Sequence, residues 1–166
     1  RARATSRHTP SFVGRMAERA ALDEELAAVA AGSARIVLLT GELGIGKSRL
    51  WREWADSTVG DRVVLEARCI AATQSLPFAP LVELFAARPC MQMLYRADSP
   101  VAPMWLAEVA RLLPAIRQQI PALPAPIALP LEEERRRVFE AFVQVLLALN
   151  AQPLVLFVDD LHWIDR

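Results

Sequence analysis

Apolar residues in the first part of the chain follow a helical period and then a strand-like run. Within residues 15–31 they recur at helical spacing among many alanines, which predicts a helix that Gly32 can end. Residues 35–40 form a short, nearly continuous apolar run, typical of a strand buried on both faces of a parallel sheet. A helix over 49–57 and a second strand over 63–67 complete a strand–helix–strand unit, which favours an α/β fold.

The middle of the chain is rich in proline. Ten of the twelve prolines fall within residues 77–130, and short helices with prolines at their edges are expected near 80–87 and 102–113. The pattern predicts a longer helix over 131–149, and the apolar run 154–158 predicts a third buried strand.

Charged residues open the long helix. Glutamates crowd its first turn, where the helix dipole favours negative charge. Glu132 with Arg136, and Glu133 with Arg137, have the spacing and order of favourable i,i+4 ion pairs. We therefore expect this charge run to form a solvated helix face.

Composition and charge narrow the function classes. Of the 166 residues 54% are hydrophobic and 23% charged, as in a folded domain, and the net charge of zero gives no sign of direct nucleic-acid binding. The longest apolar run, residues 120–131, is too short and too rich in proline to span a membrane, and no signal peptide is visible. Cys69 and Cys90 make no disulfide framework, which favours a cytoplasmic location. Because the chain starts without methionine and stops after a strand-like run, we expect a piece of a longer polypeptide.

A glycine-rich turn between the first predicted strand and the next helix matches the Walker A pattern of phosphate-binding loops. Glycines allow backbone N–H groups to point at phosphate, and the start of the following helix adds partial positive charge. A chance match in a chain of this length is on the order of one in a few hundred. The predicted nucleotide-binding residues are Gly41, Glu42, Leu43, Gly44, Ile45, Gly46, Lys47 and Ser48.

Two side chains of this turn have distinct predicted roles. Lys47 is the only lysine among nineteen basic residues. Its compact ammonium suits the β- and γ-phosphates, where the planar guanidinium of arginine would fit poorly. Ser48 offers a hydroxyl to Mg²⁺.

An acidic pair follows the third predicted strand. At the carboxyl end of a parallel strand, Asp159 and Asp160 would emerge on the sheet edge that holds the phosphate loop. Asp159 is the candidate for Mg²⁺, held directly or through water. Asp160 is the candidate general base that polarises the attacking water. His162 could contact phosphate or water or be an ordinary polar residue, and Trp163 favours packing.

Three segments together resemble a known group of proteins: residues 12–15, residues 41–50 and residues 156–165. They are similar to the AAA-type ATPase module of the STAND class. Modules of this kind occur in large bacterial LuxR-type regulators, in related activators with a bacterial transcriptional activation (BTAD) domain, and in adenylate cyclases with an ATPase region. The resemblance implies ATP rather than GTP, and it extends the nucleotide-binding set to Arg49 and, beside the adenine, to Val13, Gly14 and Arg15.

The resemblance also implies a fold. It is an α/β, three-layer P-loop NTPase (ASCE/AAA-like) fold with a parallel sheet of strand order 5-1-4-3-2, of which this chain supplies the first three strands and is incomplete at the C-terminus. The fourth strand would lie between 35–40 and 154–158. We expect residues 1–11 to be a linker or tail and 12–166 the N-terminal part of the ATPase domain, with a helical insertion at about 70–150.

By the same resemblance, the function is that of a regulatory switch. ATP and a signal would move the parent protein from a closed state to one that self-associates through this module. Lys47 and Asp160 would serve catalysis, although this stretch alone lacks part of the catalytic set.

Two alternatives remain open. One is a small-molecule kinase with the same loop, against which the residues around Asp159 and the segment Val13–Arg15 argue. The other is a module that holds nucleotide without turnover, since Asp160 stands where AAA proteins usually have glutamate. Direct contact with nucleic acid or a membrane is not expected from this segment.

Overall fold

The computed structural model describes residues 14–57, 62–96, 98–149 and 152–164. Within these ranges the chain forms two compact units, Arg1–Val59 and Gly60–Arg166, and each is described by itself.

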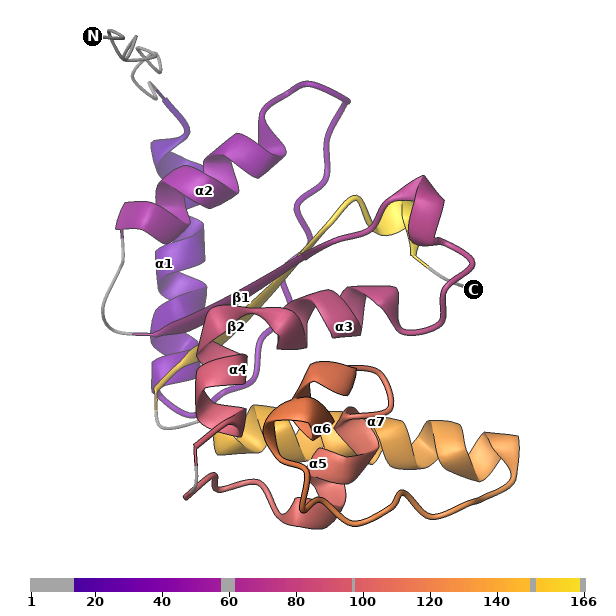
Figure 1. Cartoon of the computed structure of the whole chain (residues 1–166). Coiled ribbons are helices and arrows are strands. Elements are labelled where there is room, and N and C mark those ends of the chain that lie inside the picture. Colours follow the sequence, from indigo (N-terminus) through magenta and orange to yellow (C-terminus); the bar gives the residue numbers. More distant parts are fainter. Residues whose placement is uncertain (1–13, 58–61, 97, 150–151, 165–166) are drawn as a thin grey trace, which may run out of the picture. The chain divides into compact units, whose positions relative to one another are not determined.

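The first unit contains two helices, α1 (Met16–Ala30) and α2 (Lys47–Ser57) (Figure 1). The helix predicted over 15–31 is confirmed, and after it the N–H of Gly32 donates to the carbonyl of Val29 at 2.9 Å. The two helices are joined by a hydrogen bond from Trp54 Nε1 to Asp23 Oδ1 at 2.7 Å. Because indole N–H groups need a partner when buried, this bond explains how Trp54 is accommodated in the interior.

The prediction of a buried strand at 35–40 is wrong. Residues 33–42 adopt no regular secondary structure; the side chain of Ile36 is 100% exposed and that of Leu38 69% exposed. A strand exists only where a neighbouring backbone pairs with it, and no described residue pairs with this run. The resemblance placed a fourth strand beside it, and the described residues supply none. Of the strand–helix–strand unit predicted over 35–67, the helix and the second strand are present and the first strand is not.

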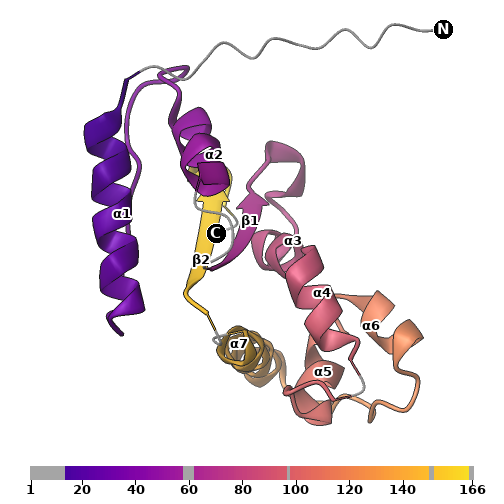
Figure 2. The ribbon, with the colours of Figure 1, turned by 90° about the vertical axis from the view of Figure 1, so that its left-hand side faces the viewer.

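The second unit contains a parallel pair of strands, β1 (Val63–Arg68) and β2 (Leu154–Asp159), which lie side by side in Figure 2. Both were predicted from apolar runs. Val63 lies opposite Leu154 and Arg68 opposite Asp159. The resemblance implied that these two strands are neighbours, which the pairing confirms. Burial is less complete than predicted, because most residues of β2 are only partly buried.

Among the described residues between the two strands there are five α-helices. Four of them carry proline in the first turn, where its fixed φ suits a helix and its missing N–H costs nothing. The short helices expected near 80–87 and 102–113 are present, with the second ending earlier than predicted. The helices are α3 (Ala79–Ala86), α4 (Arg88–Leu94), α5 (Pro103–Val109), α6 (Pro114–Gln119) and α7 (Leu131–Ala148), with short 3-10 turns at Ala71–Thr73 and Leu161–Trp163.

The core of this unit lies where β1 and the five helices meet. The rings of Phe85 on α3 and Phe142 on α7 have centroids 4.4 Å apart and join those two helices. Full burial of a side chain of this size contributes about 1.5–3 kcal/mol. Cys69 and Cys90 are also buried, and burial raises the pKa of the Cys90 thiol to about 12, so this thiol stays protonated at neutral pH. Other fully buried members are Leu65, Leu94, Val109, Ile116 and Val145.

A buried carboxylate ties α5 to α7. The side chain of Glu108 is 2% exposed and accepts one hydrogen bond from Nε of Arg111 and one from Nε of Arg137, each at 2.8 Å. Arg111 also pairs with Glu134 in the first turn of α7. Arg137 is therefore bound inward, and the predicted i,i+4 pair with Glu133 is wrong. A buried carboxylate without a cationic partner would destabilise the fold. Glu108 therefore needs the two arginines more than an exposed glutamate does.

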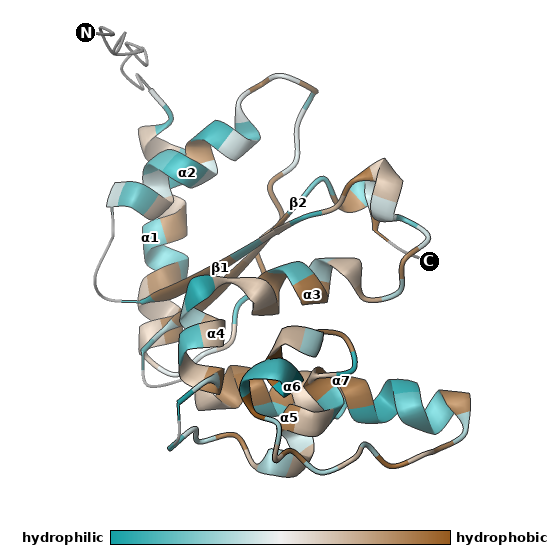
Figure 3. Cartoon of the chain, viewed as in Figure 1, coloured by the Kyte–Doolittle hydropathy of each residue, from teal (hydrophilic) through white to brown (hydrophobic). Residues whose placement is uncertain are grey.

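Only part of the charge run on α7 faces solvent as predicted. Polar and apolar stretches alternate along this helix in Figure 3. The exposed guanidinium of Arg136 pairs with Glu140, not with Glu132 as predicted. Both partners lie at i,i+4 spacing, so periodicity alone did not decide between them.

Candidate functional site

The glycine-rich turn lies within the first unit. It follows the stretch without regular secondary structure after α1 and leads into α2. Gly44 has φ +80° and Gly46 has φ +92°. Side chains with a Cβ rarely adopt these angles, so a substitution at either position would strain the turn even though there is open space around it. The predicted turn is confirmed, and α2 begins at Lys47, two residues before the predicted start.

The ammonium group of Lys47 lies over this turn. Its Nζ donates to the carbonyl of Gly41 at 2.8 Å and to that of Glu42 at 3.0 Å. As the first residue of α2, Lys47 also stands at the helix end that carries partial positive charge. The turn therefore concentrates positive charge at one exposed place, which is the condition for binding an anion.

Arg15 contacts the same turn from α1. Its guanidinium donates a hydrogen bond to the carbonyl of Ile45, and its backbone lies in the left-handed region with φ +56°. The resemblance grouped Arg15 with the nucleotide-binding residues, and the structure brings it to the turn. Gly14 precedes it and is exposed, whereas Val13 lies outside the described residues.

The remaining residues of the predicted nucleotide set lie in the same turn and at the start of α2. Ser48 is the second residue of α2, and Arg49, the third, lies 3.8 Å from Glu53 in an i,i+4 ion pair. The side chains of Leu43 and Ile45 are exposed.

The acidic pair belongs to the second unit and stands where the sequence predicted, at the carboxyl end of β2. Asp159 is the last residue of the strand, and its Oδ1 accepts the backbone N–H of Asp160 at 3.0 Å. Asp160 turns the chain with φ +54°, a conformation that aspartate tolerates better than most residues. The predicted meeting of this pair with the turn around Lys47 stays a prediction, because the two belong to separate units.

Sequence reasoning missed the partner of Asp160. Nε and one terminal nitrogen of Arg68 each lie 2.9 Å from Oδ2 of Asp160. This hydrogen bond, together with the negative charge of Asp160, raises the pKa of Arg68. The N–H of Arg68 donates to Oε2 of Glu83 at 2.8 Å, which fixes the end of β1. A signal was available in the register of the two strands, since Arg68 directly follows the strand predicted over 63–67 and lies opposite Asp159 in the parallel pair.

His162 and Trp163 follow in the short turn after Asp160, with ring centroids 5.0 Å apart and exposed side chains. Within the described ranges, no three His, Cys, Asp or Glu side chains cluster as a metal site, and no helix has the length and hydropathy needed to cross a membrane.

Comparison with known proteins identifies the family. The AAA ATPase domain family matches residues 11–166, almost the whole chain, and the chain belongs to that family. It is therefore a nucleotide-binding module of the P-loop NTPase class, and members of this family generally use ATP and Mg²⁺. Comparisons with curated proteins and with solved structures give no match.

Proposed function

We propose that this chain is the ATP-binding and ATP-hydrolysing switch of a larger regulatory protein, as in LuxR-type or BTAD-type regulators or adenylate cyclases. The observation that carries the proposal is the position of Lys47. The only lysine of the chain starts α2 and bonds two carbonyls of a glycine-rich turn. Calorimetric titration of the full chain with ATP in Mg²⁺ tests it; saturable binding with one site is expected, and no measurable heat would contradict it.

The proposed nucleotide site is built on this turn. The ammonium of Lys47 pairs with the β- and γ-phosphates, and backbone N–H groups of Gly44 to Ser48 surround them. The N-terminus of α2 adds partial positive charge. Val13, Gly14 and Arg15 lie beside the adenine, and the contact of Arg15 with Ile45 supports this placement.

The residues assigned to Mg²⁺ fit that ion by their chemistry. A hydroxyl from Ser48 and a carboxylate from Asp159 are the hard oxygen ligands that Mg²⁺ prefers, and two protein ligands suffice because the ion keeps waters and phosphate oxygens. When bound, Mg²⁺ neutralises charge on the phosphates during their transfer.

Asp160 is proposed to accept the proton of the attacking water. A carboxylate can do this only if it is held in one orientation, and the two nitrogens of Arg68 at Oδ2 hold it while Oδ1 stays outside that ion pair.

Asp160→Asn should slow single-turnover phosphate release about 100-fold while leaving the ATP dissociation constant unchanged, since general-base catalysis contributes roughly 10²–10⁴-fold. Rapid-quench assays on the longest available form of the protein measure this. Equal release by wild type and variant would remove Asp160 from catalysis. No release by either form would favour the second candidate, a module that holds nucleotide without turnover. The ion pair of Asp160 with Arg68 also favours that candidate, because it occupies one oxygen of the carboxylate.

Arg68 is a positioning residue in this proposal. Arg68→Ala should lower the hydrolysis rate constant about tenfold with unchanged ATP affinity, because the carboxylate of Asp160 loses its fixed orientation. Arg68→Lys should recover most of the rate, which a merely structural role would not require. Arg96→Ala, which removes an exposed pair with Asp98, is the matched control and should change neither quantity. Full activity in Arg68→Ala would contradict the positioning role.

A further inference from the structure

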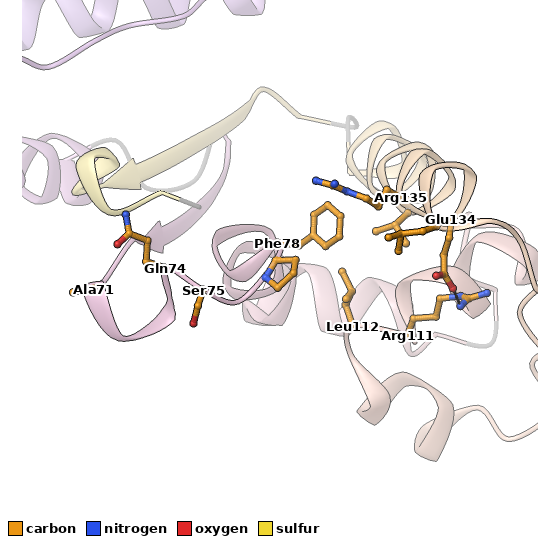
Figure 4. Close-up of a pocket in the computed structure, with 11 residues that line it drawn as sticks. Ala71, Gln74, Ser75, Phe78, Arg111, Leu112, Glu134 and Arg135 are labelled. Carbon is orange, nitrogen blue, oxygen red and sulfur yellow. Dashed lines mark hydrogen bonds and ion pairs between the residues drawn. The ribbon is translucent and has the colours of Figure 1, made fainter. Parts of the chain in front are cut away.

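The second unit contains a cavity of about 950 Å³ that the nucleotide chemistry does not use. Figure 4 shows the turn before α3 on one side of it and α7 on the other. Its size falls in the range of small-molecule sites, about 300–1,000 Å³. The lining combines apolar and polar side chains from three elements: Ala71, Gln74, Ser75, Pro77, Phe78, Arg111, Leu112, Leu131, Glu134, Arg135 and Val138.

The charges of this cavity do not balance. Arg111 is compensated, because its guanidinium contacts Glu108 and Glu134 and donates to the carbonyl of Ile127 at 2.7 Å. Arg135 has no ion pair or hydrogen bond to any described side chain. Of its neighbours three and four residues away on α7, Glu132 alone carries the opposite charge, and the two side chains form no ion pair. The cavity therefore has at its edge one exposed guanidinium that is not in an ion pair and that an anion could pair with.

An aromatic ring held in an unfavourable backbone conformation lies beside this charge. Phe78 has φ +64°, which costs a bulky residue of the order of 1 kcal/mol or more. Its ring packs edge-on against Phe139 with centroids 5.1 Å apart, and Figure 4 shows Arg135 extending from α7 past this ring. Strained residues that persist are often found at binding sites. Here the strained residue offers a flat apolar surface next to a guanidinium.

Two further polar residues line the cavity. The amide of Gln74 and the hydroxyl of Ser75 make no side-chain hydrogen bond to another described residue, and both can donate. They come from the turn opposite Arg135, so a bound group could be contacted from both sides (Figure 4).

We propose that this cavity binds an organic anion, a carboxylate or phosphate monoester attached to a flat apolar body. The anionic group pairs with Arg135, while Gln74 and Ser75 line the opposite end of the cavity (Figure 4). The apolar body lies against Phe78, Leu112 and Val138. This site shares no residue with the one proposed for ATP, and the proposal does not depend on that one.

Titration calorimetry of the full chain with three probes tests the proposal: 2-naphthoate, 2-naphthyl phosphate and the uncharged 2-naphthalenemethanol. Saturable binding is expected for at least one of the two anions, and the stronger of the two identifies the anionic group. The alcohol should bind at least about tenfold more weakly, the loss expected when a charge-assisted contact is removed.

Substitutions of single residues test whether the anion binds in this cavity. Arg135→Gln should weaken binding of the anion about tenfold. Arg136→Gln, the neighbouring exposed arginine that pairs with Glu140, should leave it unchanged. Lys47→Ala should also leave it unchanged, which separates this cavity from the phosphate loop. No saturable binding of either anion, equal binding of the alcohol, or loss of binding in Lys47→Ala but not in Arg135→Gln would overturn the proposal.

Discussion

Lys47→Ala is expected to lower the affinity for ATP in the presence of Mg²⁺ about 100-fold or more. The ammonium is the one side-chain cation proposed to contact the β- and γ-phosphates, and contacts of this kind are charge-assisted and strong. Lys47→Arg should lose most of the affinity too, because a planar fork does not fit where Nζ now bonds the carbonyls of Gly41 and Glu42. Calorimetric titration of wild type and both variants measures these changes.

The control for this experiment is Arg52→Ala. Arg52 is an exposed residue of the same helix, outside the glycine-rich turn, so its removal takes away one positive charge without touching the proposed site. Affinity should stay within about twofold of wild type, as expected for a screened surface charge. An unchanged affinity in Lys47→Ala would refute the assignment of the loop.

Glu108→Gln is expected to lower the free energy of unfolding by about 3 kcal/mol, because it leaves two arginines without the buried carboxylate that both contact. For a chain of this size the midpoint of thermal unfolding should fall by about 10 °C. Differential scanning calorimetry and urea titration followed by circular dichroism measure the two quantities.

Glu140→Gln is the matched comparison, since Glu140 pairs with Arg136 on the exposed side of α7. Its removal should cost no more than about 1 kcal/mol. Arg137→Met should cost about as much as Glu108→Gln, and the double variant should cost less than the sum because the two side chains share one interaction. If Glu108→Gln were no less stable than Glu140→Gln, the buried pair would not stabilise the unit.

A helix or strand could be predicted from the sequence where the residues of that element alone indicate its structure. The helix α7 could be predicted because its apolar period, its acidic first turn and its length agree. The pairing of β1 with β2 needed the resemblance to a family, since apolar runs do not specify their neighbours. The run 35–40 is about as apolar as those strands, yet it forms none, because a strand depends on a neighbouring backbone that pairs with it.

The site shows the same division. Lys47 and Asp159 could be predicted from motifs, because their chemistry needs fixed spacing along the chain. Arg68 was missed because its bond to Asp160 joins residues far apart in sequence, and the register of two paired strands, not a motif, brings them together. The ion pair of Arg137 with Glu108 was missed for a similar reason. Glu108 lies on another helix, and helical periodicity relates only residues of the same helix.

The parallel pairing of β1 with β2 also sets an order of events during synthesis. Val63 lies opposite Leu154, and all five helices of the unit are translated between them. Closing so long a loop is entropically costly, and contacts between distant residues are the slow ones in folding. A nascent chain can therefore form its helices as they leave the ribosome, but Val63 to Arg68 wait for Leu154 to Asp159 before their backbone is paired.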